Sequence, residues 1–148
     1  MEKAKFFSYI FIVIAISFFG LQLVNYFTRF GSVEVGNKKF RVEIANDNWE
    51  LQNGLSGRKK LKTGSGMLFI FHKSDYYMFW MKDMNFPLDI VWIDGGKIVD
   101  IKEKAPVPTT SLLEKYLPEH PTMYVLEINA GLVAKYGFKV GDLVKLEI

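Results

Sequence analysis

The feature that most constrains the fold is a nearly continuous apolar segment, Phe79–Ile90, interrupted by a few polar residues and one proline. A surface loop rarely holds so many large apolar side chains, and a half-exposed strand would alternate apolar with polar residues. The segment therefore predicts the middle of a buried sheet, with Lys82, Asn85 and Asp89 directed inward. Buried polar groups need partners, so these residues are the first candidates for a site.

Short apolar segments separated by tight turns predict a mainly β domain. We expect strands at residues 33–35, 38–45, 67–71, 77–81, 88–93, 97–104, 122–128 and 143–148. Phe40–Ile44 alternates cleanly, so one face should be buried, whereas Tyr77–Met81 and Leu88–Ile93 are apolar on both faces and should be central strands. The expected fold is α+β, mainly β: a small closed or half-closed barrel with two or three short helices, preceded by one transmembrane helix.

Three segments between the strands predict helical structure. Asp47, followed three residues later by Glu50, fits the reciprocal capping pattern and predicts a short helix over Asn48–Leu55. Ser111–Leu117 predicts a helical turn capped by its own serine, and Leu132–Tyr136 predicts a second short helix.

Residues 6–24 contain no charged side chain and are long enough to cross a membrane. As a helix they would extend about 28 Å, close to the hydrocarbon thickness of a bilayer. A cleaved signal peptide would have a shorter apolar region of about 7–15 residues ending in small residues, and a buried core helix is the remaining alternative. We therefore predict a signal anchor and linker over residues 1–30 and a separate domain over residues 31–148.

The charges beside this segment predict its orientation. Lys3 and Lys5 precede it, whereas Arg29 alone follows it closely. Because positive residues are retained on the cytoplasmic side, we expect a single-pass protein of the cell membrane with its C-terminal domain extracytoplasmic. The membrane is then one partner, through residues 6–24.

Charge and cysteine content exclude several classes. The chain contains 19 Lys and Arg residues and 16 Asp and Glu residues. The first 30 residues contain three of the basic residues and one of the acids, so the rest of the chain has a net charge of +1. A nearly neutral domain gives no electrostatic reason to expect a nucleic-acid partner. One basic cluster, Arg58–Lys62, is either a solvated turn or a contact for anionic headgroups or an acidic ligand. The absence of cysteine excludes disulfides, thiol nucleophiles and thiolate metal sites.

Several motifs together resemble one known family, the domain of unknown function 192 family. In order along the chain they are Asn53–Arg58, Gly66–Phe69, Phe79–Lys82, Pro87–Ile90, Tyr124–Glu127, Asn129–Gly131, Gly137 and Gly141–Asp142. The resemblance covers roughly residues 35–147 and implies a compact, β-rich domain, often behind a signal or anchor, with no known activity. Asp83 and Met84 depart from the Asn and Thr common in the family. The loop over residues 106–121 looks longer than usual, and Thr109–Ser111 replaces a stretch where many members carry cysteine.

Asp89 and Glu127 are the strongest candidates for chemistry. Each lies on an apolar face of its predicted strand, where a carboxylate must be paired or have a raised pKa. Arg58 and Lys82 are the expected partners. One interpretation is structural, a buried ion pair or a carboxylate that accepts backbone N–H bonds. The other is a pocket in which the two cations hold an anionic or carbonyl group and a carboxylate acts as acceptor or general base.

These residues predict a non-catalytic binding or accessory module with a small polar cleft. Its expected ligand-binding residues are Arg58, Trp80, Lys82, Asn85, Asp89 and Glu127. The ligand would be an unidentified small molecule or protein, and no cofactor is expected. The alternative is a small hydrolase or lyase with Asp89 and Glu127 as catalytic residues and Arg58 as an electrostatic clamp.

Metal binding is a further alternative. Met78, Met81 and Met84 recur every three residues near His72, and thioethers select Cu(I). In a strand this spacing places Met81 on the opposite face from the other two, which favours core packing and no metal. The aromatic residues of Tyr76–Trp80 are likewise either core residues or a platform for a sugar ring or a peptide side chain.

Overall fold

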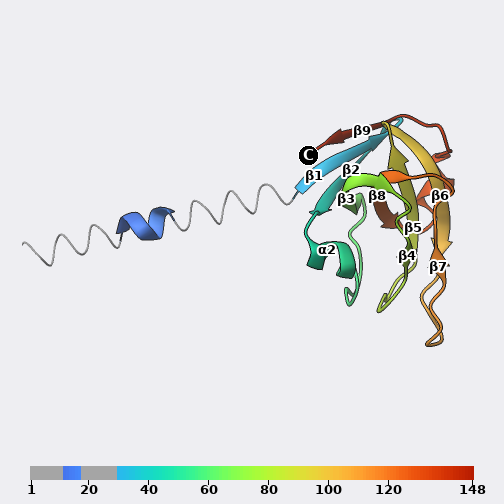
Figure 1. Cartoon of the computed structure of the whole chain (residues 1–148), viewed down its shortest axis with the longest axis horizontal. Helices are drawn as coiled ribbons and strands as arrows, with labels where there is room; N and C mark the ends of the chain where they lie inside the picture. The colour runs from blue at the N-terminus through green and yellow to red at the C-terminus, as the bar shows by residue number, and fades with distance from the viewer. Residues whose placement is uncertain (1–11, 18–29) are drawn as a thin grey trace, which may run out of the picture.

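The domain is a seven-stranded sheet that curls into a half-barrel, as the computed structural model in Figure 1 shows; the structure describes residues 12–17 and 30–148. The strands are β1 (Phe30–Val35), β2 (Lys38–Ala45), β3 (Ser65–Asp75), β5 (Leu88–Asp94), β6 (Lys97–Ala105), β8 (Thr122–Asn129) and β9 (Val144–Glu147). Their order across the sheet is β6-β5-β8-β3-β2-β1-β9. Neighbours are antiparallel except β2 and β3, which are parallel.

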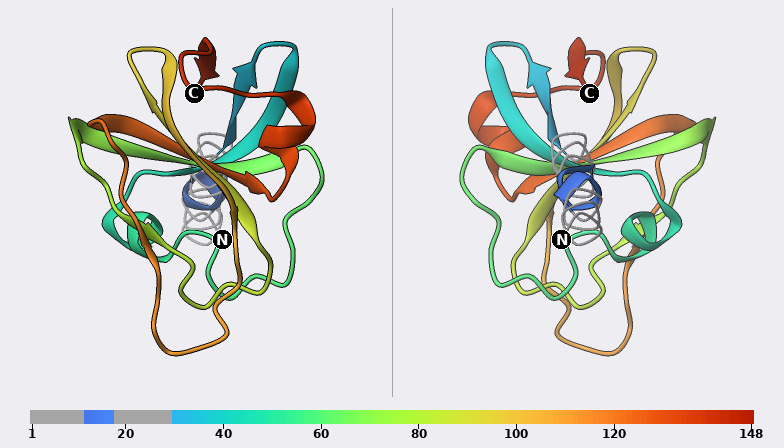
Figure 2. Two further views of the ribbon diagram at one scale, coloured as in Figure 1. Left: turned by 90° about the vertical axis from the view of Figure 1, so that its right-hand side faces the viewer. Right: turned by 90° about the vertical axis from the view of Figure 1, so that its left-hand side faces the viewer.

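The two outer strands approach each other at one end of the sheet. Lys97 of β6 forms an isolated antiparallel bridge with Leu143, and the Val144 N–H donates to the Gly96 carbonyl at 2.9 Å. Figure 2 shows this end, where β9 lies between the β1–β2 and β5–β6 hairpins. These contacts confirm the predicted half-closed barrel.

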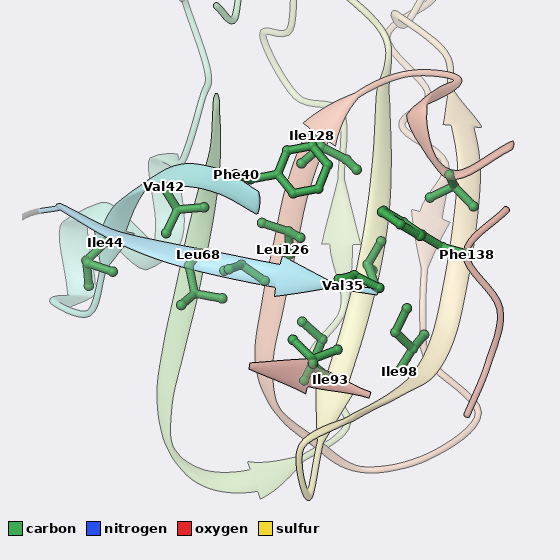
Figure 3. Packing of buried hydrophobic residues seen from close by; sticks show 14 residues of the cluster. Val35, Phe40, Val42, Ile44, Leu68, Ile93, Ile98, Leu126, Ile128 and Phe138 are labelled. Carbon is green, nitrogen blue, oxygen red and sulfur yellow. The ribbon is translucent and has the colours of Figure 1, made fainter. Parts of the chain in front are cut away.

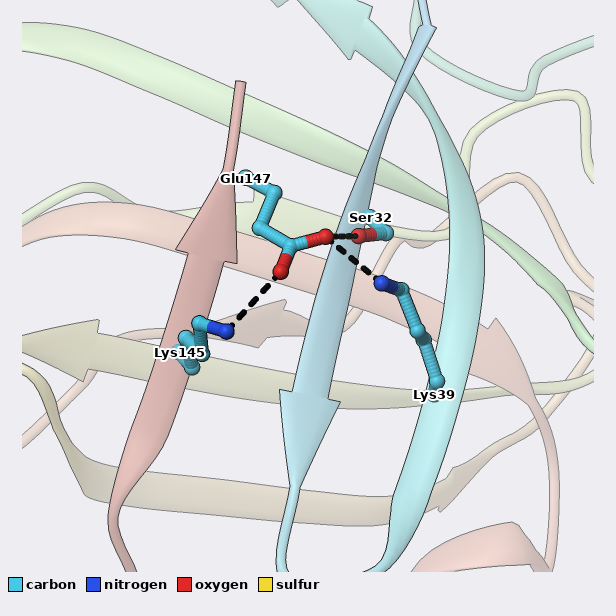
Figure 4. Close-up of polar contacts among 4 residues, drawn as sticks. All are labelled: Ser32, Lys39, Lys145 and Glu147. Atoms are coloured by element: carbon cyan, nitrogen blue, oxygen red, sulfur yellow. Dashed lines mark hydrogen bonds and ion pairs between the residues drawn. The ribbon is translucent and has the colours of Figure 1, made fainter.

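A four-residue polar cluster fixes the exposed strand β9 to its neighbours. The Glu147 carboxylate accepts hydrogen bonds from Ser32 at 2.9 Å and from Lys39 at 2.6 Å, and pairs with Lys145 at 2.9 Å (Figure 4). The bond from Lys39, then those from Lys145 and Ser32, lower the pKa of Glu147 to about 2. The last strand is therefore held by polar contacts outside as well as by apolar contacts inside.

The concave side of the sheet holds one hydrophobic core, which Figure 3 shows from close by. In β2 the side chains of Phe40, Val42 and Ile44 are buried here while Arg41 is exposed, which confirms the predicted alternation. Leu68 of β3 and Leu126 of β8 extend the same core.

A second core lies on the opposite face of β3, β5 and β8. Met67 and Phe69 belong to it, whereas Leu68 between them belongs to the first core. All six residues of Leu88–Ile93 in β5 are buried, so the predicted central strand with two covered faces is confirmed there. The second core exists because segments outside the main sheet cover this face.

Two of those covering segments correct sequence predictions. Tyr77–Met81 is not a central strand: only β4 (Phe79–Trp80) is extended, and it pairs with β7 (Lys115–Tyr116) in a separate two-stranded ribbon. Ser111–Leu117 contains this strand β7 and no helical turn. Phe79 and Met81 of the first segment and Tyr116 of the second belong to the second core, so these side chains cover the sheet and do not continue it.

The helices are short, and their ends follow local capping chemistry. Helix α2 (Asn48–Asn53) begins at Asp47, whose carboxylate accepts the Glu50 N–H at 2.8 Å, and it ends at Gly54, earlier than predicted. Glu50 completes the cap by accepting the N–H of Asn46, one residue before the cap. Helix α3 (Leu132–Tyr136) forms where predicted.

Residues 12–17 form a short helical stretch. The predicted membrane span, residues 6–24, otherwise lies outside the described residues. Within the described ranges, 12–17 and 30–148, no helix has the length and apolar character needed to cross a membrane.

Candidate functional site

Asp89 and Glu127 lie on neighbouring strands but on opposite faces of the sheet. Glu127 of β8 is opposite Ile90 of β5, and Asp89 is opposite Ile128. Ile128 belongs to the inner core and Ile90 to the outer core, so the two carboxylates point away from each other. The single cleft predicted from the sequence therefore does not form around both acids.

Asp89 is completely buried and is used for structure. Its Oδ2 accepts the N–H of Val133 in the first turn of α3 at 2.8 Å, and its Oδ1 accepts the N–H of Lys104 at 2.8 Å. Lys104 has a positive φ of 51° and lies where the β5–β6 register shifts. One carboxylate thus holds a helix start and an irregular strand together, which matches the structural interpretation of this acid.

Glu127 has the opposite character. Its side chain is only 5% exposed, and its Oε2 is the one buried side-chain N or O atom without a hydrogen-bond partner in the described part of the chain. Burial raises the pKa of Glu127 to about 8, and the attraction of the Arg58 guanidinium lowers it only in part. At neutral pH this carboxyl group is therefore mostly protonated, so it can donate one hydrogen bond as well as accept.

A pocket of about 230 Å³ opens beside Glu127 on the outer face of the sheet. Its walls come from α2 and the following turn, from the outer face of β3, and from the segment that contains β4. The lining residues are Leu51, Gln52, Asn53, Gly54, Leu55, Ser56, Phe69, Phe71, Tyr77, Met78, Phe79, Trp80, Met84 and Glu127. Most of them are apolar or aromatic, with one ionisable carboxyl group, as is usual for small-molecule sites.

Gly54 lies against the Glu127 carboxyl group at the floor of the pocket. Its φ of 48° and ψ of −125° are a conformation that other residues rarely adopt. A Cβ at this position would lie 2.8 Å from Cζ of Phe69 and 3.8 Å from Oε2 of Glu127. The same glycine that ends α2 therefore leaves space at the pocket floor.

Arg58 lies outside this pocket and is already paired. Its guanidinium donates to both oxygens of Glu43 on β2, at 2.5 and 2.7 Å, and it lines a neighbouring cavity with Glu43 and Trp49. The bond to Glu43 raises the pKa of Arg58. Arg58 therefore influences Glu127 electrostatically without lining the wall that a ligand would contact.

The other predicted site residues separate into two groups. Trp80 lines the pocket together with Glu127. Lys82 and Asn85 are exposed and not directed into the sheet; their segment is anchored by a bond from Ser56 Oγ to the Lys82 carbonyl and one from Asn85 Nδ2 to the Arg58 carbonyl, at 2.8 and 2.9 Å. Of the six predicted residues, the structure brings together Trp80 and Glu127.

The copper hypothesis gains no support from the methionine positions. Met81 and Met84 are buried in the second core, whereas Met78 is 43% exposed at the pocket and His72 is exposed on β3. Among the described residues there is no group of three or more His, Asp or Glu side chains that could hold a metal ion.

Sequence reasoning missed most of the pocket wall. Phe69 and Phe71 belong to β3, and Gly54 and Ser56 follow α2; each was interpreted as part of a strand, helix or turn. A usable signal was the position of Phe71: it shares a face of β3 with Met67 and Phe69, yet is followed by the polar residues of 72–75. That change marks the place where the outer face becomes open.

Comparisons with known proteins agree with this fold. No curated protein matches the sequence. A crystal structure of a candidate transcription regulator from Sinorhizobium meliloti 1021 is 32% identical, with a TM-score of 0.71 over 79% of this chain and 93% of that one. A protein of unknown function from Novosphingobium aromaticivorans DSM 12444 is 34% identical, with a TM-score of 0.68 over 78% of this chain and 83% of that one. The DUF192 family (Uncharacterized ACR) matches residues 31–146, and this chain therefore belongs to that family.

Proposed function

We propose that the domain is a binding module for a small ligand and that the pocket beside Glu127 is its binding site. The observation that carries the proposal is the buried Oε2 of Glu127, which has no hydrogen-bond partner and belongs to a residue that lines the pocket. An unsatisfied buried oxygen costs about 1–3 kcal/mol, and a ligand that supplies the missing partner recovers that free energy. Asp89, whose oxygens both have partners, offers no such gain.

The pocket volume limits the size of the bound group. At about 230 Å³ it is smaller than the 300–1,000 Å³ typical of drug-sized ligands. It suits one ring or a short alkyl chain with a single polar head, either as a free molecule or as the end of a larger one.

Ligand binding is best tested with the full-length chain in detergent. A thermal-shift panel of small amines, amides, alcohols, sugars and carboxylates should contain compounds that stabilise the wild-type chain, because a ligand at about 100 times its Kd contributes about 2.7 kcal/mol. Trp80→Ala removes a pocket wall and should abolish the shift. Trp49→Ala truncates another exposed tryptophan outside the pocket and should retain it. Shifts that survive both Trp80→Ala and Glu127→Leu would place binding elsewhere.

Catalysis is a second candidate, supported by one observation. A carboxyl group with a pKa of about 8 is suited to proton transfer near neutral pH. The predicted paired-acid version is not supported, because Asp89 lies on the other face. A hydrolase or lyase would depend on Glu127 alone, so Glu127→Gln should bind ligand but lose all turnover; turnover that persists in this variant contradicts the catalytic candidate.

We propose in addition that residues 6–24 anchor the chain in the cell membrane with the domain on the extracytoplasmic side. The uncharged segment and the positive residues before it support this proposal. Alkaline carbonate extraction should leave the chain in the membrane pellet, and protease added outside intact cells should degrade the domain. Release of the chain by carbonate would contradict the membrane anchor. Protection of the domain from the protease would contradict its extracytoplasmic location.

A further inference from the structure

We infer that the Glu127 pocket binds the protonated amino group of a small, mostly apolar ligand, an inference that rests on the proposed binding function. The unpartnered Oε2 of Glu127 would accept the ammonium group, and the aromatic walls would surround the apolar part.

The charges around the pocket favour a cationic ligand over an anionic one. Among the described residues that line it, Glu127 is the single acid, and none is Lys, Arg or His. The nearest cationic influence, Arg58, is neutralised by two bonds from its guanidinium to Glu43 and lines a different cavity. An anion in the pocket would have no charged partner, whereas an ammonium group would have one as soon as Glu127 gives up its proton.

The walls also suit a cation. Phe69, Phe71, Tyr77, Phe79 and Trp80 all line the pocket, and aromatic ring faces attract ammonium groups. Phe71 and Tyr77 stack on each other with ring centroids 3.5 Å apart and an interplanar angle of 7°. Trp80 is 37% exposed and is accessible from solvent.

Binding of an amine should release a proton from the protein. The free Glu127 carboxyl has a pKa of about 8 and is mostly protonated at pH 7, whereas the ammonium-bound form must be a carboxylate. Besides burial, the group that bears on this titration is Arg58, whose guanidinium is bound to Glu43 on β2. A neutral ligand that accepts a hydrogen bond from the protonated carboxyl would release no proton.

Three probes with one shared ring separate these possibilities. Benzylamine, benzyl alcohol and benzoate are titrated calorimetrically into the full-length chain in detergent at pH 7, in two buffers that differ in ionisation enthalpy. We expect benzylamine to bind at least tenfold more tightly than benzyl alcohol and benzoate not to bind. The binding heats in the two buffers should differ. Divided by the difference in buffer ionisation enthalpy, that difference should give nearly one proton released for each amine bound.

The variants assign this effect to Glu127. Glu127→Gln keeps the shape of the side chain, so benzylamine should lose at least tenfold in affinity and the proton release should disappear. Glu147→Gln makes the same replacement at an exposed position on β9 and should leave both the affinity and the proton release unchanged.

One outcome would overturn the amine inference alone, and another would overturn the proposed binding function as well. Equal binding of amine and alcohol without proton release, blocked by Trp80→Ala, would retain the pocket as a binding site and overturn the amine inference. Failure of all three probes to bind, together with a negative ligand panel, would overturn the proposed function as well.

Discussion

Two buried carboxylates on adjacent strands, Asp89 and Glu127, have opposite environments. Both oxygens of Asp89 accept backbone N–H groups at 2.8 Å on the inner face of the sheet. Glu127 on the outer face has an oxygen without a partner and a raised pKa. Burial alone therefore does not define a site: the acid that folding has satisfied is structural, and the one that folding leaves unsatisfied is the candidate for ligand binding.

The largest effect should follow removal of the satisfied carboxylate. Asp89→Ala leaves the N–H groups of Lys104 and Val133 without their acceptor inside the protein. Hydrogen bonds to a charged group contribute about 1.5–3 kcal/mol each, so we expect a loss of about 3–5 kcal/mol in chemical denaturation. Asp89→Asn retains one acceptor and should lose less. A chain with Asp89→Ala as stable as the wild type would remove the contrast between the two acids.

Replacing the Glu127 carboxyl group should raise the stability of the chain, whereas replacing that of Asp89 should lower it. The folded-state pKa of about 8 exceeds the ordinary 4.5, so the stability associated with this group is full below pH 4.5 and is lost as pH rises through 8. Glu127→Gln avoids this loss and should stabilise the unliganded chain at pH 8 by on the order of 2–4 kcal/mol, with little effect at pH 4. Denaturation at both pH values measures it. If Glu127→Gln changes the free energy of unfolding equally at pH 4 and pH 8, the pKa of Glu127 is not raised in the folded chain.

Gly54→Ala should have an intermediate effect. The new Cβ would contact the Phe69 ring at 2.8 Å, and φ of 48° is unfavourable for alanine, so we expect a loss of about 1–2 kcal/mol. Gly57→Ala is the matched control, because Gly57 also has a positive φ, 74°, but its Cβ would meet nothing within 4 Å. If the two variants lose equal stability, backbone strain explains the whole effect and Gly54 is not required by the packing at the pocket floor.

The smallest effect on stability should come from Arg58→Gln. Its ion pair with Glu43 is partly exposed, with 37% and 36% of the two side chains accessible, so the loss should be below about 1 kcal/mol. The pKa of Glu127 should nevertheless rise further, because the attraction from Arg58 is removed. NMR titration of the labelled carboxyl carbon measures this shift. Lys82→Gln is the control. If it shifts the pKa of Glu127 more than Arg58→Gln does, Arg58 is not the cation that lowers this pKa.

The sequence predicted those elements whose signals are local. Alternation placed the buried and exposed residues of β2 correctly, and Asp47 fixed the start of α2. The segment around β4 was misassigned because a continuous apolar stretch is compatible both with a central strand and with a cover packed on a sheet. Only contacts distant in sequence distinguish these two cases.

The candidate site shows the same limit. The sequence identified Asp89 and Glu127 as carboxylates on apolar strand faces, and each does lie on the face it shares with apolar neighbours. It could not place those two faces relative to each other, because successive side chains of a strand point to opposite sides. Pairing of Asp89 with Ile128 separates the acids, and a shift of one residue would have put them on the same side.

What the sequence determined by itself is the membership of the family, the mainly β character and the unusual polar groups within apolar segments. The tertiary structure alone decided which polar group is satisfied. Lys104 and Val133 bring N–H groups to Asp89 from β6 and α3, and no described group does so for Oε2 of Glu127. The reason is physical: hydrogen-bond satisfaction depends on what the fold places within about 3 Å, and segments far apart in the sequence supply those neighbours.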